Sequence, residues 1–277
     1  MIHDNDQTIE HFHIHGWMRV RAAFSADEAT AMRAAVWSAL ADVGISRSEP
    51  STWTKERPEH LQHLKNHPAF RAVGSVRLLQ AIVAALEGQA YERPRNWGAC
   101  FLAFPSQRPW NVPSGGWHID ANYMSALSPP LGVRTHALFG DVAPRAGGTL
   151  IVSGSHRLVH TYFKDHPPPP GARGVDYRRL LQGHPYLRDL HTEGDARERA
   201  GRFMDRSEDH DGIPLRVVEN AGTAGDVILL HPLVLHVATP NTGNAPRFLL
   251  SGGIDLPSMW NTSASTIASR GRASDHS

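Results

Sequence analysis

The stretch that decides the fold is Gly225-Asp226-Val227-Ile228-Leu229-Leu230-His231-Pro232-Leu233-Val234-Leu235-His236. Its two apolar runs have the length of short strands, and the His231-Pro232 pair between them is typical of a turn. His236 ends the second run, where burial among apolar neighbours would leave its imidazole without water. The stretch therefore predicts a strand, a turn and a second strand that carries a histidine to a bound partner, of which a metal ion is the simplest.

Short β-compatible runs of the same kind recur along the chain from residue 97 and alternate with glycine and proline. They lie at residues 100–104, 135–142, 149–153, 216–218, 227–230, 233–238 and 248–254. Many short strands at this spacing favour a β-sandwich or a double-sheet jelly roll over a parallel α/β sheet.

The first third of the chain, residues 1–96, reads as mainly helical. An alternating run at 16–24 suits a short strand, and Ser25-Ala26-Asp27-Glu28 then matches a capping box that opens a helix to about Leu40. A second helix is expected from Pro58 to just before Pro68, and a third from Phe70 to Leu86. His11, His13 and His15 alternate at strand spacing and are expected to be exposed to solvent.

These patterns predict one domain over residues 1–257, with a jelly-roll core at 97–257. The polar, proline-rich stretch at about 155–214 is expected to be an insertion over one mouth of the barrel, and residues 258–277 a flexible tail.

The composition limits the possible partners. A net charge of +1, from 28 basic and 27 acidic residues, gives no reason to expect nucleic acid or an anionic membrane. The chain shows neither a secretory signal nor an apolar run of the roughly 20 residues that span a bilayer. The single cysteine, Cys100, fits a reducing compartment, so a cytoplasmic protein with a small-molecule substrate is expected. Its oligomeric state is not readable from the sequence.

Gly116-Trp117-His118-Ile119-Asp120 supplies a candidate metal motif. In a strand His118 and Asp120 point the same way, and with His236 they form the ligand set of a 2-His-1-carboxylate facial triad, which suits Fe(II) and leaves positions open for 2-oxoglutarate and O2. A closed zinc site would instead require several cysteines. In a chain with 18 histidines the His-x-Asp pair alone is a weak signal, and a hydrogen-bonded turn is its simplest alternative.

Arg247 follows His236 by eleven residues, and its guanidinium could hold the far carboxylate of 2-oxoglutarate with paired hydrogen bonds. An arginine at a strand start is also commonly solvated or ion-paired. His231 competes with His236 as third ligand, although the spacing to Arg247 favours His236.

At this point the chain resembles the phytanoyl-CoA dioxygenase family of Fe(II)/2-oxoglutarate oxygenases. The resemblance rests on His118-Ile119-Asp120, on the run from Gly147 to His156, and on the block from Gly225 to Arg247, which includes Thr239-Pro240-Asn241. It implies a double-stranded β-helix, or cupin-like jelly roll, flanked by helices. It also implies that His118, Asp120 and His236 bind iron and that Arg247 binds the C5 carboxylate of 2-oxoglutarate.

The resemblance implies three further cosubstrate contacts. Cys100 falls where a family side chain lies against 2-oxoglutarate, and His136 stands where the family commonly has tryptophan. The hydroxyl residue expected two places after His236 is replaced by Ala238, and Thr239 is its expected substitute.

The chemistry implied is hydroxylation of an unactivated C–H bond with release of succinate and CO2. Iron halogenases of related fold lack the carboxylate that Asp120 provides, so halogenation is disfavoured. Two alternatives stay open: a cupin-like metal enzyme that does not use 2-oxoglutarate, and a non-catalytic binding protein on the same scaffold.

Overall fold

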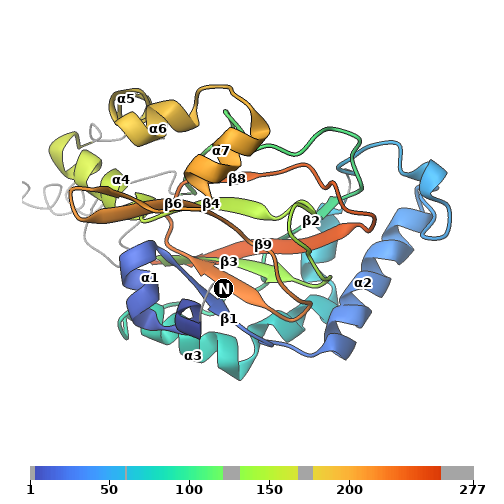
Figure 1. The fold of residues 1–277 in the computed structure, drawn as a ribbon. Coiled ribbons are helices and arrows are strands. Elements are labelled where there is room, and N and C mark those ends of the chain that lie inside the picture. Colours follow the sequence, from blue (N-terminus) through green and yellow to red (C-terminus); the bar gives the residue numbers. More distant parts are fainter. Residues whose placement is uncertain (1–3, 60, 121–131, 168–176, 257–277) are drawn as a thin grey trace, which may run out of the picture.

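The centre of the protein is a pair of antiparallel sheets. The computed structural model describes residues 4–59, 61–120, 132–167 and 177–256 (Figure 1), so the expected tail at 258–277 lies outside the described residues. The larger sheet has the spatial order β1 (Trp17–Val20), β7 (Val227–Leu230), β3 (Gly132–Leu138), β9 (Arg247–Asp255) and β2 (Ala99–Ala103). The smaller sheet has the order β5 (Glu208–His210), β6 (Ile213–Glu219), β4 (Thr149–Ser153) and β8 (His236–Ala238).

The apolar run at 227–230 forms strand β7, which is buried on both faces of the larger sheet. Val227 and Leu229 pack on the helical side of the larger sheet, whereas Ile228 and Leu230 point between the sheets. There they meet residues of both sheets, among them Ile151 of β4. A strand that is buried on both faces reads as a continuous apolar run, as this one does.

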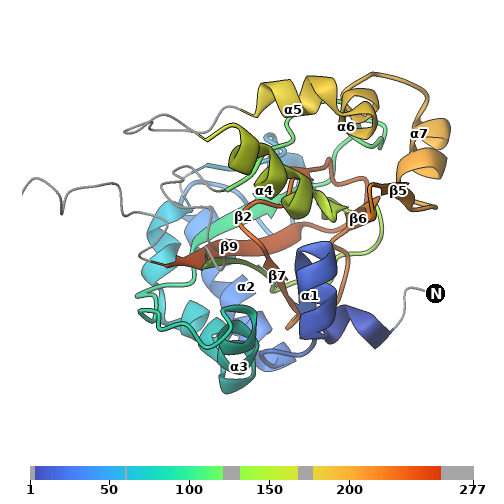
Figure 2. The ribbon, with the colours of Figure 1, turned by 90° about the vertical axis from the view of Figure 1, so that its left-hand side faces the viewer.

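Helices cover the outer faces of both sheets (Figures 1 and 2). The N-terminal layer on the larger sheet contains η1 (Asp4–Gln7), α1 (Ile9–His15), α2 (Ala26–Ala41), η2 (Pro50–Thr52), η3 (Gln62–Asn66), η4 (Pro68–Gly74) and α3 (Val76–Ala85), where η denotes a 3-10 helix. This arrangement of two sheets between helices is the jelly roll with flanking helices that the sequence predicts, and the predicted fold class is confirmed.

The helix at Ser25 begins with the predicted capping box. The Ser25 hydroxyl accepts a hydrogen bond from the Glu28 N–H (3.2 Å), and the Glu28 carboxylate accepts one from the Ser25 N–H (2.7 Å). Its buried residues are Ala29, Met32, Val36 and Leu40, which recur at helical spacing and so share one face.

Several predicted boundaries are wrong. Residues 9–15 form helix α1, which Thr8 caps at its start and Gly16, at φ 78°, at its end, and of the three histidines expected to be exposed only His13 is, whereas His11 and His15 are half-buried. Between Pro58 and Pro68 the described residues, all but residue 60, form only the short 3-10 helix η3. The helix expected at 70–86 is divided at Ser75, whose hydroxyl accepts from the Leu78 N–H and starts α3 afresh. The strand expected at 233–238 is regular only over His236–Ala238.

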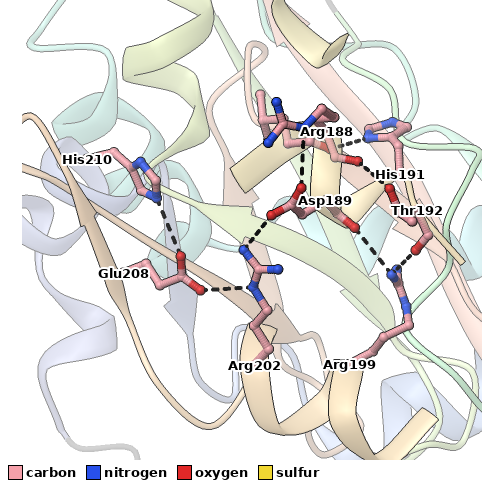
Figure 3. Close-up of polar contacts among 9 residues, drawn as sticks. Arg188, Asp189, His191, Thr192, Arg199, Arg202, Glu208 and His210 are labelled. Atoms are coloured by element: carbon pink, nitrogen blue, oxygen red, sulfur yellow. Dashed lines mark hydrogen bonds and ion pairs between the residues drawn. The ribbon is translucent and has the colours of Figure 1, made fainter. Parts of the chain in front are cut away.

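The described part of the insertion up to Phe203 is mainly helical and packs on the outer face of the smaller sheet, and β5 and the start of β6 complete the expected insertion. It contains α4 (Ser155–Asp165), α5 (Arg178–Gly183), α6 (Pro185–Leu190) and α7 (Ala196–Phe203). Val159, Leu187 and Phe203 share a core with Val152 and Leu215 of the sheet. A polar network around Asp189, Arg199 and Arg202 joins α6 to α7 (Figure 3).

Within the described ranges, no helix is both long and apolar enough to cross a membrane.

Candidate metal centre

Backbone hydrogen bonds place the first two candidate ligands beside the third. The His118 N–H donates to the His236 carbonyl (3.0 Å), and the His236 N–H donates back to the His118 carbonyl (2.9 Å). The Asp120 N–H donates to the Pro232 carbonyl (3.2 Å). An isolated antiparallel bridge therefore joins His118 to the start of β8, and the bond to Pro232 holds Asp120 beside the segment that leads into β8.

The three side chains converge at one point. His118 Nε2 lies 4.0 Å from Asp120 Oδ1, and His236 Nε2 lies 3.7 Å from Asp120 Oδ2. One ligand atom from each residue lies within 4.8 Å of the other two, and within the described residues this is the only group of three or more His, Cys, Asp or Glu side chains that meets this condition. The spacing suits a single ion bound on one face.

Both imidazoles are held in the tautomer that a metal requires. His118 Nδ1 lies 2.9 Å from the Gly116 carbonyl, and His236 Nδ1 lies 3.0 Å from the Val234 carbonyl. A carbonyl only accepts, so each Nδ1 carries the proton and each Nε2 offers its lone pair to the site. Burial also lowers the pKa of His236, although Asp120 opposes the shift, so this ring is neutral and able to bind metal.

A cavity of about 510 Å³ opens beside the triad. His118 and His236 line it together with His136, Arg247 and Phe101, so the two candidate histidine ligands and the candidate cosubstrate arginine face one space. Pockets of this volume are typical of small-molecule sites.

Arg247 is a buried cation without a carboxylate partner among the described residues. Only 5% of it is exposed, its Nη1 donates to the Phe101 carbonyl at 3.4 Å, and its Nε is buried without a hydrogen-bond partner in the described chain. Burial lowers the pKa of Arg247 to about 10, and the charge of Arg57 contributes to this shift. An unpaired buried charge is costly, so the side chain is poised for an anionic ligand.

The other candidate cosubstrate residues are placed unevenly. His136 is fully buried, lines the cavity and has an unpartnered Nδ1; burial, followed by His236, holds its pKa well below the usual value. Cys100 also lines the cavity, but it pairs with Leu250 in the sheet and packs in the core beneath the helices. Burial raises the pKa of this thiol to about 12.

Thr239 is buried, and its hydroxyl donates to the Gly148 carbonyl at 2.7 Å. Ala238, rather than Thr239, lines the cavity.

The structure adds residues that the sequence reasoning did not single out. Arg134 Nη2 donates to the Asp120 carbonyl (3.3 Å), its Nε lies 3.9 Å from Asp120 Oδ2, and it forms an ion pair with Asp255 (2.6 Å). Phe101 lines the cavity although 46% of it is exposed. Arg134 lies two residues before His136, so both side chains point to the same face of the strand. This spacing is the one feature of the sequence that could have indicated Arg134 as a site residue.

The fold and the site together define a double-stranded β-helix with a His-x-Asp…His group at its interior. Residues 12–249 match the phytanoyl-CoA dioxygenase (PhyH) family, and the chain belongs to this family. A search of curated protein sequences gave no significant match.

Solved structures share the fold at low sequence identity. The epimerase SnoN, in complex with Fe³⁺, α-ketoglutarate and nogalamycin RO, is 16% identical with a TM-score of 0.52, over 89% of this chain and 81% of SnoN. AviO1 from Streptomyces viridochromogenes Tue57 is 15% identical with a TM-score of 0.52, over 90% and 93% of the two chains. EctD from S. alaskensis is 18% identical with a TM-score of 0.51, over 92% and 79%.

Proposed function

We propose that the protein is an Fe(II)- and 2-oxoglutarate-dependent dioxygenase that hydroxylates an unactivated C–H bond of a small molecule. The observation that carries this proposal is that both histidines of the candidate facial triad line one cavity with an unpaired, buried arginine. The triad would bind a metal ion, and the arginine would bind the carboxylate of a ligand beside that ion.

His118, Asp120 and His236 would hold the iron, with their rings oriented by the Gly116 and Val234 carbonyls. Bound iron would supply the O2 chemistry that decarboxylates 2-oxoglutarate to succinate and CO2 and places the second oxygen atom in the substrate C–H bond. Arg134 keeps Asp120 in place through its carbonyl and faces its carboxylate.

Arg247 would bind the far carboxylate of 2-oxoglutarate, since its Nε and part of its Nη donor capacity are unused. His136 would face the same cosubstrate from β3 as a neutral ring. Cys100 and Thr239 remain proposed contacts, Cys100 at the cavity wall and Thr239 next to Ala238 on β8.

The retained carboxylate of Asp120 favours transfer of oxygen rather than halide. SnoN is described as an epimerase, which illustrates that this fold hosts other oxidative outcomes. A product heavier than the substrate by one oxygen atom, formed together with succinate, would distinguish hydroxylation from desaturation, cyclisation or epimerisation.

The first experiment adds Fe(II) and 2-oxoglutarate without oxygen and records the visible spectrum. Wild type is expected to show a weak metal-to-ligand charge-transfer band that is lost in His236→Ala and weakened in Arg247→Ala. His231→Gln is the matched control: the His231 Nδ1 accepts from the Leu233 N–H, outside the triad, so the band should persist.

Absence of the band in metal-loaded wild type would overturn the use of 2-oxoglutarate and favour a metal enzyme without this cosubstrate. A full-strength band in Arg247→Ala would refute the role of that arginine.

A further inference from the structure

A second cavity, of about 280 Å³, is lined by basic side chains. Lys65, Arg71, Arg93 and Arg95 line it, together with His67. Its remaining lining residues, Asn66, Phe70, Pro94, Asn96 and Trp97, include no carboxylate. We call this cavity the basic pocket.

The four cations of the basic pocket have no ion-pair partner among the described residues, in contrast to Arg19, Arg108 and Arg202, which pair with carboxylates. This concentration does not follow from the overall charge, because the chain has 28 basic and 27 acidic residues. Residues 61–86 contain neither aspartate nor glutamate. Like charges around one cavity repel each other, and an anion within it would replace that repulsion with attraction.

The framework of the pocket is preformed. Phe70 and Trp97 are 1% and 4% exposed, and Gly74 lies against the Trp97 indole so closely that a Cβ there would be 2.5 Å from Nε1. Arg93 Nη2 donates to the Gly74 carbonyl at 2.9 Å, which fixes one guanidinium at the rim.

His67 adds a further donor. Its Nδ1 accepts from the Ala69 N–H at 3.3 Å, so in the neutral ring Nε2 carries the proton. Three arginines, one lysine and one histidine therefore line a space whose lining contains no carboxylate. Arginine forks match the oxygens of a phosphoryl group, and lysine adds a point charge.

The basic pocket and the metal cavity lie on the same short element. Gln62, at the start of η3, lines the metal cavity, whereas Lys65 and Asn66, at its end, line the basic pocket. A 3-10 helix rises about 2 Å per residue, so η3 spans roughly 8 Å between these ends. A molecule held in the basic pocket could extend to the metal cavity through a short spacer.

We propose that the basic pocket binds the phosphate or diphosphate group of an organic phosphate, and that this group anchors the substrate whose other end is oxidised at the metal centre. The anchoring role rests on the proposed function, whereas phosphate binding does not. Exposed guanidinium and ammonium groups recognise a ligand mainly by its negative charge. A diphosphate ester and free pyrophosphate should therefore both bind to the basic pocket.

The test measures pyrophosphate binding to the full-length protein by titration calorimetry in a phosphate-free buffer of low ionic strength. Wild type is expected to bind, with a Kd that rises with added salt because the contacts are between charges. Arg71→Ala and Arg95→Ala should each weaken binding at least tenfold. Arg77→Ala is the matched control, since Arg77 is exposed on the neighbouring helix α3 and does not line the pocket.

No measurable binding would overturn the proposal, as would equal weakening by Arg77→Ala. Inorganic phosphate, titrated in parallel, distinguishes the sources: tighter binding of pyrophosphate indicates a diphosphate ester, and equal binding a monophosphate. Arg247→Ala should bind pyrophosphate like wild type. If the charge-transfer band is absent but pyrophosphate binds at Arg71 and Arg95, the proposed function fails and the phosphate site stands. If the band is present but pyrophosphate does not bind, the phosphate site fails and the proposed function stands.

Discussion

Arg199 of α7 should be one of the most important single side chains for the stability of the insertion. It is only 6% exposed, and its guanidinium donates to five backbone carbonyls. Val112 (3.1 Å) and Pro113 (3.3 Å) belong to the segment that leads into the metal motif. Asp189 (3.4 Å), Leu190 (2.8 Å) and Thr192 belong to the end of α6 and the loop after it. Figure 3 shows the contacts of Arg199 with Asp189 and Thr192.

The size of the effect follows from burial. The bonds to Val112 and Leu190 are fully buried, and the other three are partly buried. Hydrogen bonds to a charged group contribute about 1.5–3 kcal/mol each, and water cannot replace the donor at the two buried carbonyls. Arg199→Met should therefore lower the free energy of unfolding by about 3–6 kcal/mol. At roughly 2–4 °C per kcal/mol, Tm should fall by at least about 6 °C.

Urea unfolding followed by circular dichroism measures this loss, with Arg202→Met as the matched control. Arg202 lies three residues further along α7 and pairs with Asp189 (2.8 Å) and Glu208 (3.3 Å), but its side chain is 37% exposed. Exposed ion pairs contribute about 0–1 kcal/mol, so the control should lose little. A loss below about 1 kcal/mol in Arg199→Met, or equal losses in the two variants, would refute the reasoning.

Two further predictions concern buried polar groups. Burial lowers the pKa of His156 to about 4 from 6.5, with Arg157, His15 and His13 acting in the same direction, while its bond to the His13 carbonyl opposes this. The unfolded chain thus takes up a proton before the folded chain does, and stability should fall as pH drops from about 6.5 towards 4. Because His231 and His11 shift in the same direction, His156→Gln should flatten this slope in urea titrations without abolishing it; an unchanged slope would contradict the assignment. Thr239→Val should cost about 1–3 kcal/mol, since the Gly148 carbonyl loses its donor. An increased Kd for 2-oxoglutarate in this variant would show that the hydroxyl serves the cosubstrate as well.

Most strands were predictable because they leave a local signature, whereas β5 (Glu208–His210) lies in the polar stretch where no strand was expected. The runs at 149–153 and 227–230 coincide with β4 and β7, since their apolar residues are buried on both faces. The capping box of α2 was likewise readable because its two hydrogen bonds join residues three apart. The N-terminal α1 was not, because its histidines alternate like a strand and the helix is fixed by Thr8 and Gly16 at its ends.

The sequence indicates the three candidate metal ligands, which the structure brings together, but it does not indicate their tautomers. Those depend on the Gly116 and Val234 carbonyls, whose directions follow from the turn and from the bridge between His118 and His236. The Arg134 contact with Asp120 also arises only when β3 and the ligand segment meet in space. The number of residues that separate Arg134 from Asp120 in the sequence does not predict such a contact.

The three ligand side chains differ in what holds them before a metal binds. The His236 side chain is 8% exposed and lies in β8, so packing fixes its ring, whereas the His118 side chain is 51% exposed and depends on the bond from its Nδ1 to Gly116. Gly116 lies three residues after Pro113. The Pro113 carbonyl accepts hydrogen bonds from both the Arg199 guanidinium and the Trp117 indole. The insertion therefore supports the more exposed ligand through the backbone that precedes it. Consequently, Arg199→Met should weaken Fe(II) binding more than Arg202→Met does, even where both variants are folded.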